Sequence, residues 1–448
     1  LNFEYVPAPR TILKGVRKLE AGEVLVAQRS APIRRQRYWQ LEYEPKHELS
    51  WPEAVEGFQE RFSRAVERRL MSDVPLGAFL SGGIDSSAIV AMMARHSNRP
   101  VQTFSIGFED SSYDESRYAR LVSRHFGTEH HTEVVTSNSL EHIDSVFDDL
   151  DEPLADFSTL PTRLLCRLAR RNVTVCLSGD GGDELLAGYE RHTASLLARG
   201  SIDLAPRQLL PLWRGLAAAI PPRSSKKGFW NKAKRFLEGA GRDPEGRQFR
   251  WQSFSSQALR ERLYGELLRD AEPLESSFAP VSTLLESAVA SHSLDRELAV
   301  EVGLYLQNDI LPKLDMMSMS ASLEARVPFL DHELVDFVAR LPPALKQRMG
   351  RGKVLLRTAM DGVLPREILD RPKEGFGMPV KHWLRRDLYD RFRQSFEASN
   401  LDGMLRPEAC LSLLEEHREE RVDHSHVLWA LFSLEEWSRR NLRERESA

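Results

Sequence analysis

A glycine-rich turn between an apolar run and a helical stretch constrains the fold of this chain more than any other feature. Residues 74–80 (VPLGAFL) form the short apolar run that is typical of a buried strand. Residues Ser87–His96 are predicted as a helix, and SGGIDSS, Ser81–Ser87, joins the two. A strand, a tight turn and a helix in this order predict a βα unit, which requires a parallel sheet around it.

The composition of this turn indicates anion binding. Gly82 and Gly83 let backbone N–H groups approach a phosphate group closely, and the helix N-terminus adds the positive end of its dipole. Hydroxyl donors come from Ser81, Ser86 and Ser87. Asp85 would repel phosphate unless a cation lies between them, which indicates Mg²⁺. An ordinary glycine-rich turn is the plainer alternative. The Gly-Lys-Ser/Thr ending of kinase-type and GTPase-type loops is absent, which disfavours those sites.

Strands and helices alternate up to about residue 195. Three further strands are predicted at 101–108, 132–135 and 173–177, each followed by a helical segment. This order predicts an α/β fold with a doubly wound parallel sheet, helices on both faces and ligands beyond the carboxyl ends of the strands. Strand signals end near residue 195, and we expect mainly helices after it, with a basic solvated loop at 222–235.

A second glycine-rich turn, SGDGGDE at Ser178–Glu184, follows the strand predicted at 173–177. In a doubly wound sheet this turn can face the first one across the crevice where nucleotides bind. We expect Asp183 to share a Mg²⁺ ion with Asp85, and Asp180 to act as a base. Taken alone, such an acidic turn is more often a plain turn or a simple metal site. Its pairing with the first turn favours a nucleotide site.

A third segment, RPKEGFGMPV at 371–380, places Lys373 between a proline and several glycines. This composition is typical of a mobile loop, which we expect to bring one positive charge to a phosphoryl centre. Without the other two motifs, a surface lysine is the default interpretation. In the segment 311–337, the methionine-rich part is predicted as helix core. Its charged residues are expected to form a buried ion network rather than a substrate contact: Glu324, Arg326 and Asp331.

Composition excludes several other classes of function. The 448 residues carry 62 Lys plus Arg against 66 Asp plus Glu, and the net charge of −4 argues against a broad nucleic-acid face or a membrane-surface role. The three cysteines, Cys166, Cys176 and Cys410, support neither a zinc site nor a disulfide framework. No stretch has the roughly 20 apolar residues of a membrane helix, and the first ten residues do not resemble a signal peptide. We therefore expect a cytoplasmic protein that binds neither nucleic acid nor membrane.

Four segments in this order, SGGIDSS, SGDGGDELLAGY, SMSASLEARVPFLD and PKEGFGMPV, resemble the synthetase domain of glutamine-hydrolysing asparagine synthetases of the B type. The resemblance covers essentially the whole chain. Residues 1–45 resemble the last strands of the family's N-terminal-nucleophile glutaminase domain, and 46–448 resemble its synthetase domain. That domain would comprise an ATP-pyrophosphatase α/β core at 46–195 and a mainly helical part at 196–448. The bulk of a glutaminase domain, with its catalytic N-terminal cysteine, is not in this sequence, so we expect no glutamine hydrolysis from it.

The resemblance implies a two-step reaction. The side-chain carboxylate of L-aspartate attacks the α-phosphorus of ATP, and pyrophosphate leaves. Ammonia, derived from glutamine in the intact enzyme, then attacks the acyl-adenylate to give asparagine and AMP. Carried over by position, Asp85 and Asp183 would hold Mg²⁺, Asp180 would be catalytic, and Lys373 would stabilise charge as pyrophosphate leaves. Phe79 and Ile106 would contact adenine through their backbones. The residues expected to bind ATP and pyrophosphate are Phe79, Leu80, Ser81, Gly82, Gly83, Asp85, Ser86, Ser87, Ile106, Ser178 and Gly179.

Asp180 departs from the family pattern, because asparagine synthetases proper usually carry Glu at this position. Asp is one methylene shorter, so either the substrate sits differently or the backbone compensates. Aspartate remains the favoured acceptor, and an amidotransferase of the same family that acts on another carboxylate is the alternative. Two further hypotheses are another ATP-pyrophosphatase-loop ligase, such as a tRNA-thiolating enzyme or a citrulline ligase, and a non-catalytic nucleotide-binding module. The sequence leaves the oligomeric state open, with a homodimer as one option.

Overall fold

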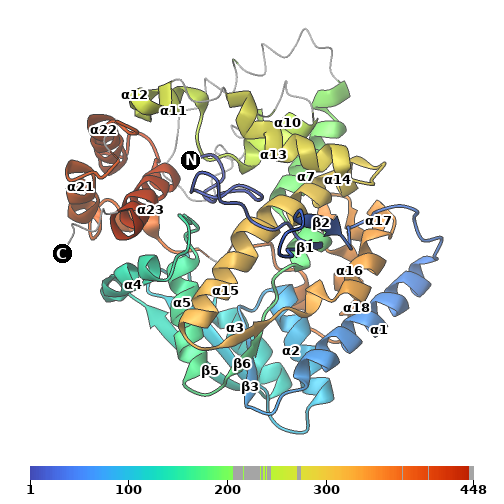
Figure 1. Ribbon diagram of the computed structural model, residues 1–448. Coiled ribbons are helices and arrows are strands. Elements are labelled where there is room, and N and C mark those ends of the chain that lie inside the picture. Colours follow the sequence, from blue (N-terminus) through green and yellow to red (C-terminus); the bar gives the residue numbers. More distant parts are fainter. Residues whose placement is uncertain are drawn as a thin grey trace.

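The computed structural model describes residues 1–204, 244–269, 274–375, 377–401 and 403–442, and five single positions between 215 and 239. A parallel sheet lies at the centre of one half of the molecule, with helices on both of its faces (Figure 1). The basic loop predicted at 222–235 lies almost entirely outside the described residues. Within the described part of the chain, no helix combines the length and the apolar character that a membrane span requires.

The central sheet has five parallel strands in the order β5-β4-β3-β6-β7. The four strands predicted from the sequence are confirmed. The strands are β3 (Leu76–Phe79), β4 (Gln102–Phe108), β5 (Glu129–Val135), β6 (Val175–Leu177) and β7 (Glu324–Arg326). The chain runs outward from β3 through β4 to β5 and then returns to the other side of β3 to form β6. The switch point of the sheet therefore lies between β3 and β6, where doubly wound folds bind ligands.

The prediction that strands end near residue 195 is wrong, because β7 completes the sheet from the far side of the helical region. Its residues pair in parallel with β6, with Leu177 opposite Arg326. An edge strand needs no continuous apolar run, since one of its sides faces solvent or loops. Glu324 is exposed, so the segment EAR carries no apolar alternation that could reveal a strand.

Helices cover the two faces of the sheet with separate hydrophobic cores. On one face, α2 (Ile84–His96) and α3 (Ser116–Phe126) connect β3, β4 and β5, and α1 (Trp51–Leu70), α16 (His332–Ala339) and α18 (Val354–Ala359) pack outside them. On the other face lie α4 (Ile143–Asp148), α5 (Thr159–Arg170) and α15 (Leu311–Ser320). Helices on both faces of a parallel sheet confirm the predicted α/β class.

Two predictions for the segment 311–337 have different outcomes. The methionine-rich part is helix core as predicted, because it forms α15 and buries Met317 fully. The single buried ion network is wrong. Asp331 is buried and pairs with Arg69 at 2.9 Å, whereas Arg326 pairs at 2.7 Å with the exposed Glu324. The reason is the edge position of β7, which leaves Glu324 in solvent.

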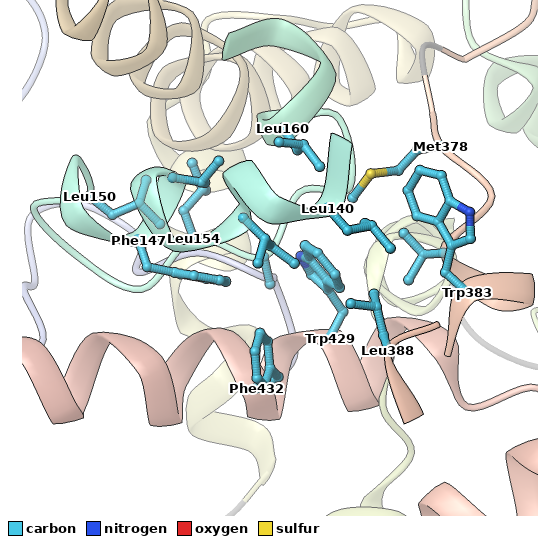
Figure 2. Packing of buried hydrophobic residues seen from close by; sticks show 14 of the residues in the cluster. Leu140, Phe147, Leu150, Leu154, Leu160, Met378, Trp383, Leu388, Trp429 and Phe432 are labelled. Carbon is cyan, nitrogen blue, oxygen red and sulfur yellow. The ribbon is translucent and has the colours of Figure 1, made fainter. Parts of the chain in front are cut away.

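The C-terminal helices pack against α4 and α5 through aromatic side chains. Figure 2 shows Trp429 and Phe432 of α23 (Ser425–Asn441) lying against Phe147 of α4 and its neighbours. Phe432 stacks on Phe392 of α21 (Tyr389–Glu397) with ring centres 4.0 Å apart, and it meets Phe147 edge-on at 5.5 Å. Large, fully buried aromatic contacts of this kind fix the C-terminal helices on the sheet domain.

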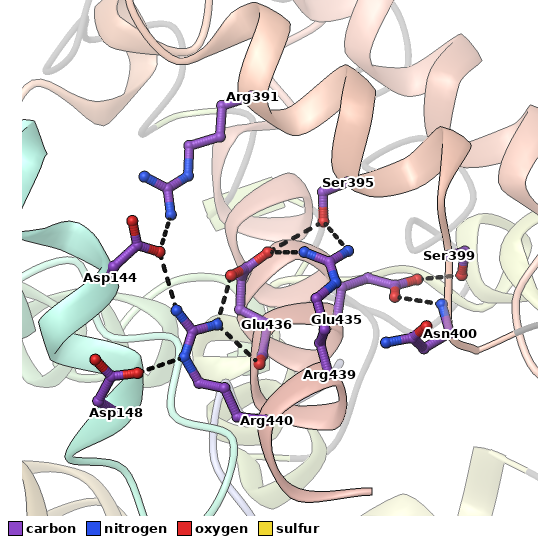
Figure 3. A network of polar contacts seen from close by, with 10 residues as sticks. All are labelled: Asp144, Asp148, Arg391, Ser395, Ser399, Asn400, Glu435, Glu436, Arg439 and Arg440. Atoms are coloured by element: carbon purple, nitrogen blue, oxygen red, sulfur yellow. Dashed lines mark hydrogen bonds and ion pairs between the residues drawn. The ribbon is translucent and has the colours of Figure 1, made fainter. Parts of the chain in front are cut away.

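A network of ion pairs also joins α23 to α4 at the surface. The guanidinium of Arg440 lies 2.7 Å from Asp148, 2.9 Å from Asp144 and 2.6 Å from Glu436, and Arg391 also pairs with Asp144 (Figure 3). One arginine of α23 thus joins two carboxylates of α4 to one of its own helix. Single ion pairs near a surface add little stability, whereas several charges joined in one network can add more.

The remaining elements connect the sheet to the helical part. The N-terminal hairpin consists of β1 (Glu23–Val26) and β2 (Arg34–Arg37), and a second hairpin consists of β8 (Gln347–Arg348) and β9 (Arg351–Gly352). The other helical elements are η1 (Ser137–His142), α6 (Gly182–Leu185), α7 (Glu190–Arg199), η2 (Ile202–Leu204), α10 (Pro244–Gln252), α11 (Gln257–Leu263), α12 (Glu266–Arg269), α13 (Leu274–Ser287), α14 (Ser293–Val300), the π-helix η4 (Glu301–Ile310), η5 (Pro328–Leu330), α17 (Pro343–Lys346), α19 (Arg366–Leu369), α20 (Val380–Trp383) and α22 (Pro407–Arg418).

Candidate active site

The first glycine-rich turn leaves the start of α2 open. The N–H of Leu80 donates to the carbonyl of Phe104 at 2.8 Å just beyond β3, and α2 begins at Ile84 with Gly83 as its N-cap. No side chain caps this helix. Its first amide groups therefore have no side-chain partner, which is the arrangement that binds phosphate groups at helix N-termini.

Gly82 holds this turn against α3. Its φ angle is +71°, and a Cβ atom at this position would lie 2.5 Å from the backbone carbonyl carbon of Tyr118. Both the left-handed backbone and the close approach exclude a side chain here. The turn is therefore fixed in shape by its contact with α3.

The three serines of the turn differ in their surroundings. The hydroxyl oxygens of Ser81 and Ser86 lie 3.1 Å apart, and Ser86 also lies within donating distance, 3.2 Å, of the carbonyl of Gly83. Ser87 is fully buried, and its hydroxyl has no hydrogen-bond partner among the described residues. Ser81 and Ser86 thus lie together at the turn, whereas Ser87 lies inside the core.

The second glycine-rich turn packs directly on the first one, as the motif pairing predicts. A Cβ atom on Gly179 would lie 2.9 Å from the backbone nitrogen of Ser86, and one on Gly182 would lie 2.6 Å from Oδ1 of Asp85. The backbone of one turn therefore touches the start of α2. Ser178, which opens the second turn, donates its N–H to the carbonyl of Arg326 at 2.8 Å.

Two carboxylates and two lysines meet where these turns touch. Lys353 Nζ pairs with Oδ2 of Asp85 and lies 2.6 Å from Oδ1 of Asp183. Lys373 Nζ lies 2.5 Å from Oδ2 of Asp183. The structure thus brings together three residues predicted for the site, Asp85, Asp183 and Lys373, and adds Lys353, which the motifs did not single out.

Lys353 reaches the site from an unfavourable backbone conformation. It follows the β8–β9 hairpin, adopts a φ angle of +55° and forms the N-cap of α18. Its side chain is 3% exposed, so both of its carboxylate partners share a charge that water barely reaches. A non-glycine residue in this conformation costs energy, and such residues are enriched at functional sites.

The two carboxylates differ in their proton affinity. Burial alone would raise the pKa of Asp183, but Lys353 and Lys373 hold it well below the usual range. Burial raises the pKa of Asp85, and the negative charge of Asp183 raises it further. Lys353 lowers it, but only enough to offset part of this rise. Asp183 is therefore the firmly ionised member of the pair. Lys373 is held in its charged form, because Asp183 and Asp85 raise its pKa against the effect of burial.

The donor set suits a magnesium ion that is bound mainly by phosphate. Oδ1 of Asp85 is buried and has no hydrogen-bond partner among the described residues. Within the described ranges, no group of three or more His, Cys, Asp or Glu side chains is arranged to hold a metal ion. Mg²⁺ usually takes one or two protein carboxylates together with phosphate oxygens and water. Asp85 and Asp183 fit this pattern, and they are the residues that would hold the ion.

The segment that carries Lys373 is anchored at both ends. At its start, buried Arg371 donates to the carbonyl of Gly82 at 3.0 Å, pairs with Glu115 at 2.7 Å and stacks 3.9 Å above the ring of Tyr118. At its end, Met378 is buried in the aromatic cluster beside Trp383 (Figure 2). Lys373 thus lies two residues after an arginine that binds the first turn itself.

Asp180 forms a hydrogen bond within the second turn. Its Oδ2 accepts a hydrogen bond from the hydroxyl of Ser178 at 2.6 Å, and its charge contributes to the raised pKa of Lys313 on α15. Gly181, with a φ angle of +88°, turns the chain between Asp180 and α6. The charge of Asp180 thus acts on the α15 side of the second turn.

Glu184, the last acid of the second turn, is buried and binds Tyr189. Its carboxylate accepts a hydrogen bond from the Tyr189 hydroxyl at 2.5 Å. Burial and the charge of Asp183 raise the pKa of Glu184 to about 7. The ring of Tyr189 lies 5.9 Å from the ammonium group of Lys373. Glu184 and Tyr189 thus lie next to the lysine–carboxylate cluster, and the charge of Glu184 helps to raise the pKa of Lys373.

Strand β4 extends past the end of β3. Phe79 pairs with Phe104, and the carbonyl of Phe104 accepts from Leu80. Residues of a parallel strand alternate in the side to which their N–H and C=O groups point. The backbone groups of Ile106 therefore point to the same side as those of Phe104, beyond the last residue of β3. This is the edge at which the family resemblance implies an adenine contact.

The sequence carries only weak signals for the residues that its motifs missed. Lys353 ends the segment Gly350–Lys353, GRGK, whose glycines and basic residues are typical of turns that bind anions. It is not preceded by an apolar strand, so nothing local connects it to the sheet. Arg371 lies within the third segment, but only the fold reveals that it binds Gly82.

Comparison with known proteins identifies the relatives of this chain. A sequence model of the asparagine synthase family matches residues 57–439. The curated protein asparagine synthetase [glutamine-hydrolyzing] 1 of Bacillus subtilis is 29% identical over 446 residues, which cover 99% of this chain and 68% of the relative. A putative asparagine synthetase [glutamine-hydrolyzing] of Mycobacterium bovis is 33% identical over 446 residues, 97% of this chain and 66% of the relative.

A further relative bears a different name. Amidase chyE of Penicillium rubens is 27% identical over 434 residues, which cover 88% of this chain and 63% of that protein. This chain therefore spans about two thirds of the length of the curated relatives that it matches.

Proposed function

The chain belongs to the asparagine synthase family, and from this membership we propose that it catalyses ATP-dependent, AMP-forming amide synthesis on a carboxylic acid, with L-aspartate as the favoured acceptor. The observation that carries the proposal is the meeting of Asp85, Asp183, Lys353 and Lys373 at the switch point of the sheet. Two fixed cations beside two carboxylates and an uncapped helix N-terminus suit the binding and transfer of phosphate groups.

In the first step of the proposed reaction, a carboxylate oxygen of the acceptor attacks the α-phosphorus of ATP. The bond from the α-phosphorus to the bridging oxygen breaks, and pyrophosphate leaves with that oxygen. The amide groups at the start of α2 and the hydroxyls of Ser81 and Ser86 would bind the departing phosphates. Lys353 and Lys373 would offset the charge that develops on them. Mg²⁺, when held by Asp85 and Asp183, would neutralise a further part of the phosphate charge.

In the second step, the nitrogen of ammonia attacks the acyl carbon of the adenylate, the carbon–oxygen bond to AMP breaks, and one proton leaves the nitrogen. Asp180 would lie on the acceptor side and take part in this step. Its hydrogen bond from Ser178 keeps its carboxylate oriented. The nucleotide would be held by the backbones of Phe79, Leu80 and Ile106 on one side and by Ser178 and Gly179 on the other.

The acceptor could also be a carboxylic acid other than aspartate. Two points favour this second candidate: Asp180 is shorter than the Glu that the family resemblance leads us to expect, and one relative is named an amidase. A change of acceptor would leave the adenylation chemistry at the two turns unchanged. The proposal also includes a cytoplasmic location, since ATP is the co-substrate and the three cysteines are buried and free.

Pyrophosphate–ATP exchange tests the proposal. We expect Mg²⁺-dependent exchange of labelled pyrophosphate into ATP that requires L-aspartate and no ammonia. Replacement of Lys373 by Ala should lower the exchange rate at least about 100-fold, whereas replacement of the exposed Lys14 by Ala should not change it. Exchange that requires another carboxylic acid would replace the acceptor and keep the chemistry. If the protein binds Mg²⁺–ATP but exchanges no pyrophosphate with any acid of a broad panel, the proposed enzymatic activity is wrong and a nucleotide-binding module is favoured.

A further inference from the structure

Arg357 has a buried N–H group without a partner. It lies on α18, one helical turn after Lys353, and its Nε donates to the carbonyl of Gly352 at 3.2 Å. Its Nη1 atom is buried and has no hydrogen-bond partner among the described residues. Guanidinium groups in proteins are almost always fully paired when water cannot reach them, because an unpaired buried donor is costly. The buried, unpaired Nη1 group of Arg357 therefore indicates that a ligand supplies its hydrogen-bond acceptor.

The position of Arg357 connects it to the phosphate site. The backbone N–H of Arg357 donates to the carbonyl of Lys353, the N-cap of α18, at 2.9 Å, and the side chain of Lys353 pairs with Asp85 and Asp183. Burial and the charge of Arg351 lower the pKa of the Arg357 guanidinium, while Asp85, Asp370 and Asp183 act in the opposite direction. The carboxylates of both glycine-rich turns are therefore close enough to act on this side chain.

The other cations around the two turns already have partners. Lys353 and Lys373 share Asp85 and Asp183, and Arg371 pairs with Glu115. Pyrophosphate would bring additional negative charge to this cluster. The unpaired N–H of Arg357 is the natural partner for that charge, because guanidinium N–H groups match the geometry of phosphate oxygens.

We propose that Arg357 binds an oxygen of the pyrophosphate part of ATP and retains this contact on pyrophosphate as it leaves. This inference rests on the proposed function and adds one binding residue to it. The competing explanation is structural: Arg357 would only hold the β8–β9 hairpin through the carbonyl of Gly352. The two explanations differ in what they predict for pyrophosphate and for AMP, because only the loss of a residue that binds pyrophosphate weakens pyrophosphate binding more than AMP binding.

The test measures binding of magnesium pyrophosphate and of AMP by calorimetry, together with the thermal midpoint, for R357Q and R357K. The control is R366Q, on α19, whose side chain is 75% exposed and pairs with Asp361 at 3.1 Å. We expect R357Q to weaken pyrophosphate binding by about 10- to 100-fold, the effect of one lost charge-assisted hydrogen bond. AMP affinity and the thermal midpoint should stay near the wild-type values. R357K should fall between R357Q and the wild type, and R366Q should match the wild type.

Three results separate this inference from its alternatives. Equal losses of AMP and pyrophosphate affinity in R357Q, with a lower thermal midpoint, would overturn it in favour of the structural role. Wild-type affinity for pyrophosphate in R357Q, or no pyrophosphate binding by the wild type, would overturn it directly. Selective loss of pyrophosphate binding in a protein that exchanges no pyrophosphate with any acid would support Arg357 and contradict the proposed function.

Discussion

Asp183 is the residue on which the charge balance of the candidate site depends most. It pairs with both Lys353 and Lys373, and these lysines hold its pKa well below the usual range despite its burial. Asparagine at this position would keep the shape and remove the charge. Each lysine would then lose a carboxylate partner in a place that water barely reaches, and such losses are strongly destabilising.

We predict that Asp183→Asn lowers pyrophosphate–ATP exchange at least about 100-fold and lowers the free energy of unfolding by about 3 kcal/mol. Exchange assays and urea unfolding measure the two effects. Asp370→Asn is the matched control, because Asp370 pairs with Arg351 at the surface, where its side chain is 61% exposed. Full exchange activity in the Asp183 variant would contradict its role in the site.

Gly82 allows a second test at the scale of one residue. A methyl group there would meet the backbone of α3 at 2.5 Å and occupy a left-handed conformation, so Gly82→Ala should displace the first turn. We predict loss of ATP binding and a fall in unfolding free energy of about 1–3 kcal/mol. Gly127 also has a positive φ but has no atom within 4 Å of a Cβ, so Gly127→Ala should cost about 1 kcal/mol and retain ATP binding. Equal behaviour of the two variants would show that the close approach at Gly82 does not matter.

The motifs predict some residues of the site and not others. Asp85, Asp183 and Lys373 were predicted because each lies in a glycine-rich segment. Such a segment is a local pattern that can be recognised in the sequence. Lys353 reaches the same cluster through a hairpin that starts from α17, more than 260 residues after Asp85. A contact of that sequence separation depends on the whole fold, so no local pattern can indicate it.

At the scale of elements, the C-terminal helix α23 fixes the aromatic cluster that also anchors the Lys373 segment. Phe432 is fully buried between Phe392 and Phe147, and Met378 lies in the same cluster (Figure 2). Helix α23 is also joined to α4 by the ion pairs of Arg440 with Asp144 and Asp148 (Figure 3). Loss of packing in α23 should therefore affect a segment far from it along the chain.

We predict that Phe432→Ala lowers the free energy of unfolding by about 3–5 kcal/mol, the usual cost of a large cavity in a core. Leu442→Ala, at the end of the same helix and with Leu442 51% exposed, should change it by less than about 0.5 kcal/mol. Urea unfolding of the three proteins measures both values. A cost below about 1 kcal/mol for the Phe432 variant would show that the aromatic cluster is not a tightly packed core.

Strands could be predicted from the sequence where their burial requires a run of apolar residues. The central strands β3, β4 and β6 are covered on both faces, and their apolar runs predict them. The edge strand β7 is three residues long and half exposed, and its place in the sheet depends on pairing with β6 across a long helical insertion. Strand content at a sheet edge follows from tertiary pairing more than from local composition.

At the scale of the whole molecule, a buried ion pair joins helical elements from distant parts of the chain. Glu301 of η4 is fully buried, accepts from Nε of Arg191 on α7 at 2.5 Å and accepts from Gln252 on α10 at 2.9 Å. Burial would raise the pKa of Glu301, but Arg191 lowers it to about 2. One carboxylate thus joins three helical elements that lie far apart in the chain.

This pair predicts an acid-dependent part of the stability. A carboxylate with a folded-state pKa of about 2 and an ordinary value near 4.5 stabilises the fold above pH 4.5. That contribution, about 3 kcal/mol, is lost as the pH falls from about 4.5 to about 2. Glu301→Gln should remove this pH dependence and destabilise the protein at neutral pH, since Arg191 would lose its partner. Urea unfolding between pH 2 and pH 7 measures this pH dependence of the stability. Glu141→Gln is the control, since the side chain of Glu141 is 74% exposed. Parallel pH profiles of wild type and the Glu301 variant would contradict the assignment.

The central claim is that the two glycine-rich turns and their lysines transfer an adenylyl group to a carboxylate. Isotope tracing tests it most directly: L-aspartate labelled with ¹⁸O in the side-chain carboxylate is incubated with ATP, Mg²⁺ and ammonia, and the products are analysed by mass spectrometry. Attack of the carboxylate on the α-phosphorus predicts asparagine and AMP, with one ¹⁸O atom transferred to the AMP phosphate. Label in inorganic phosphate, with ADP as the nucleotide product, would contradict the account, because the carboxylate would then have attacked the γ-phosphorus.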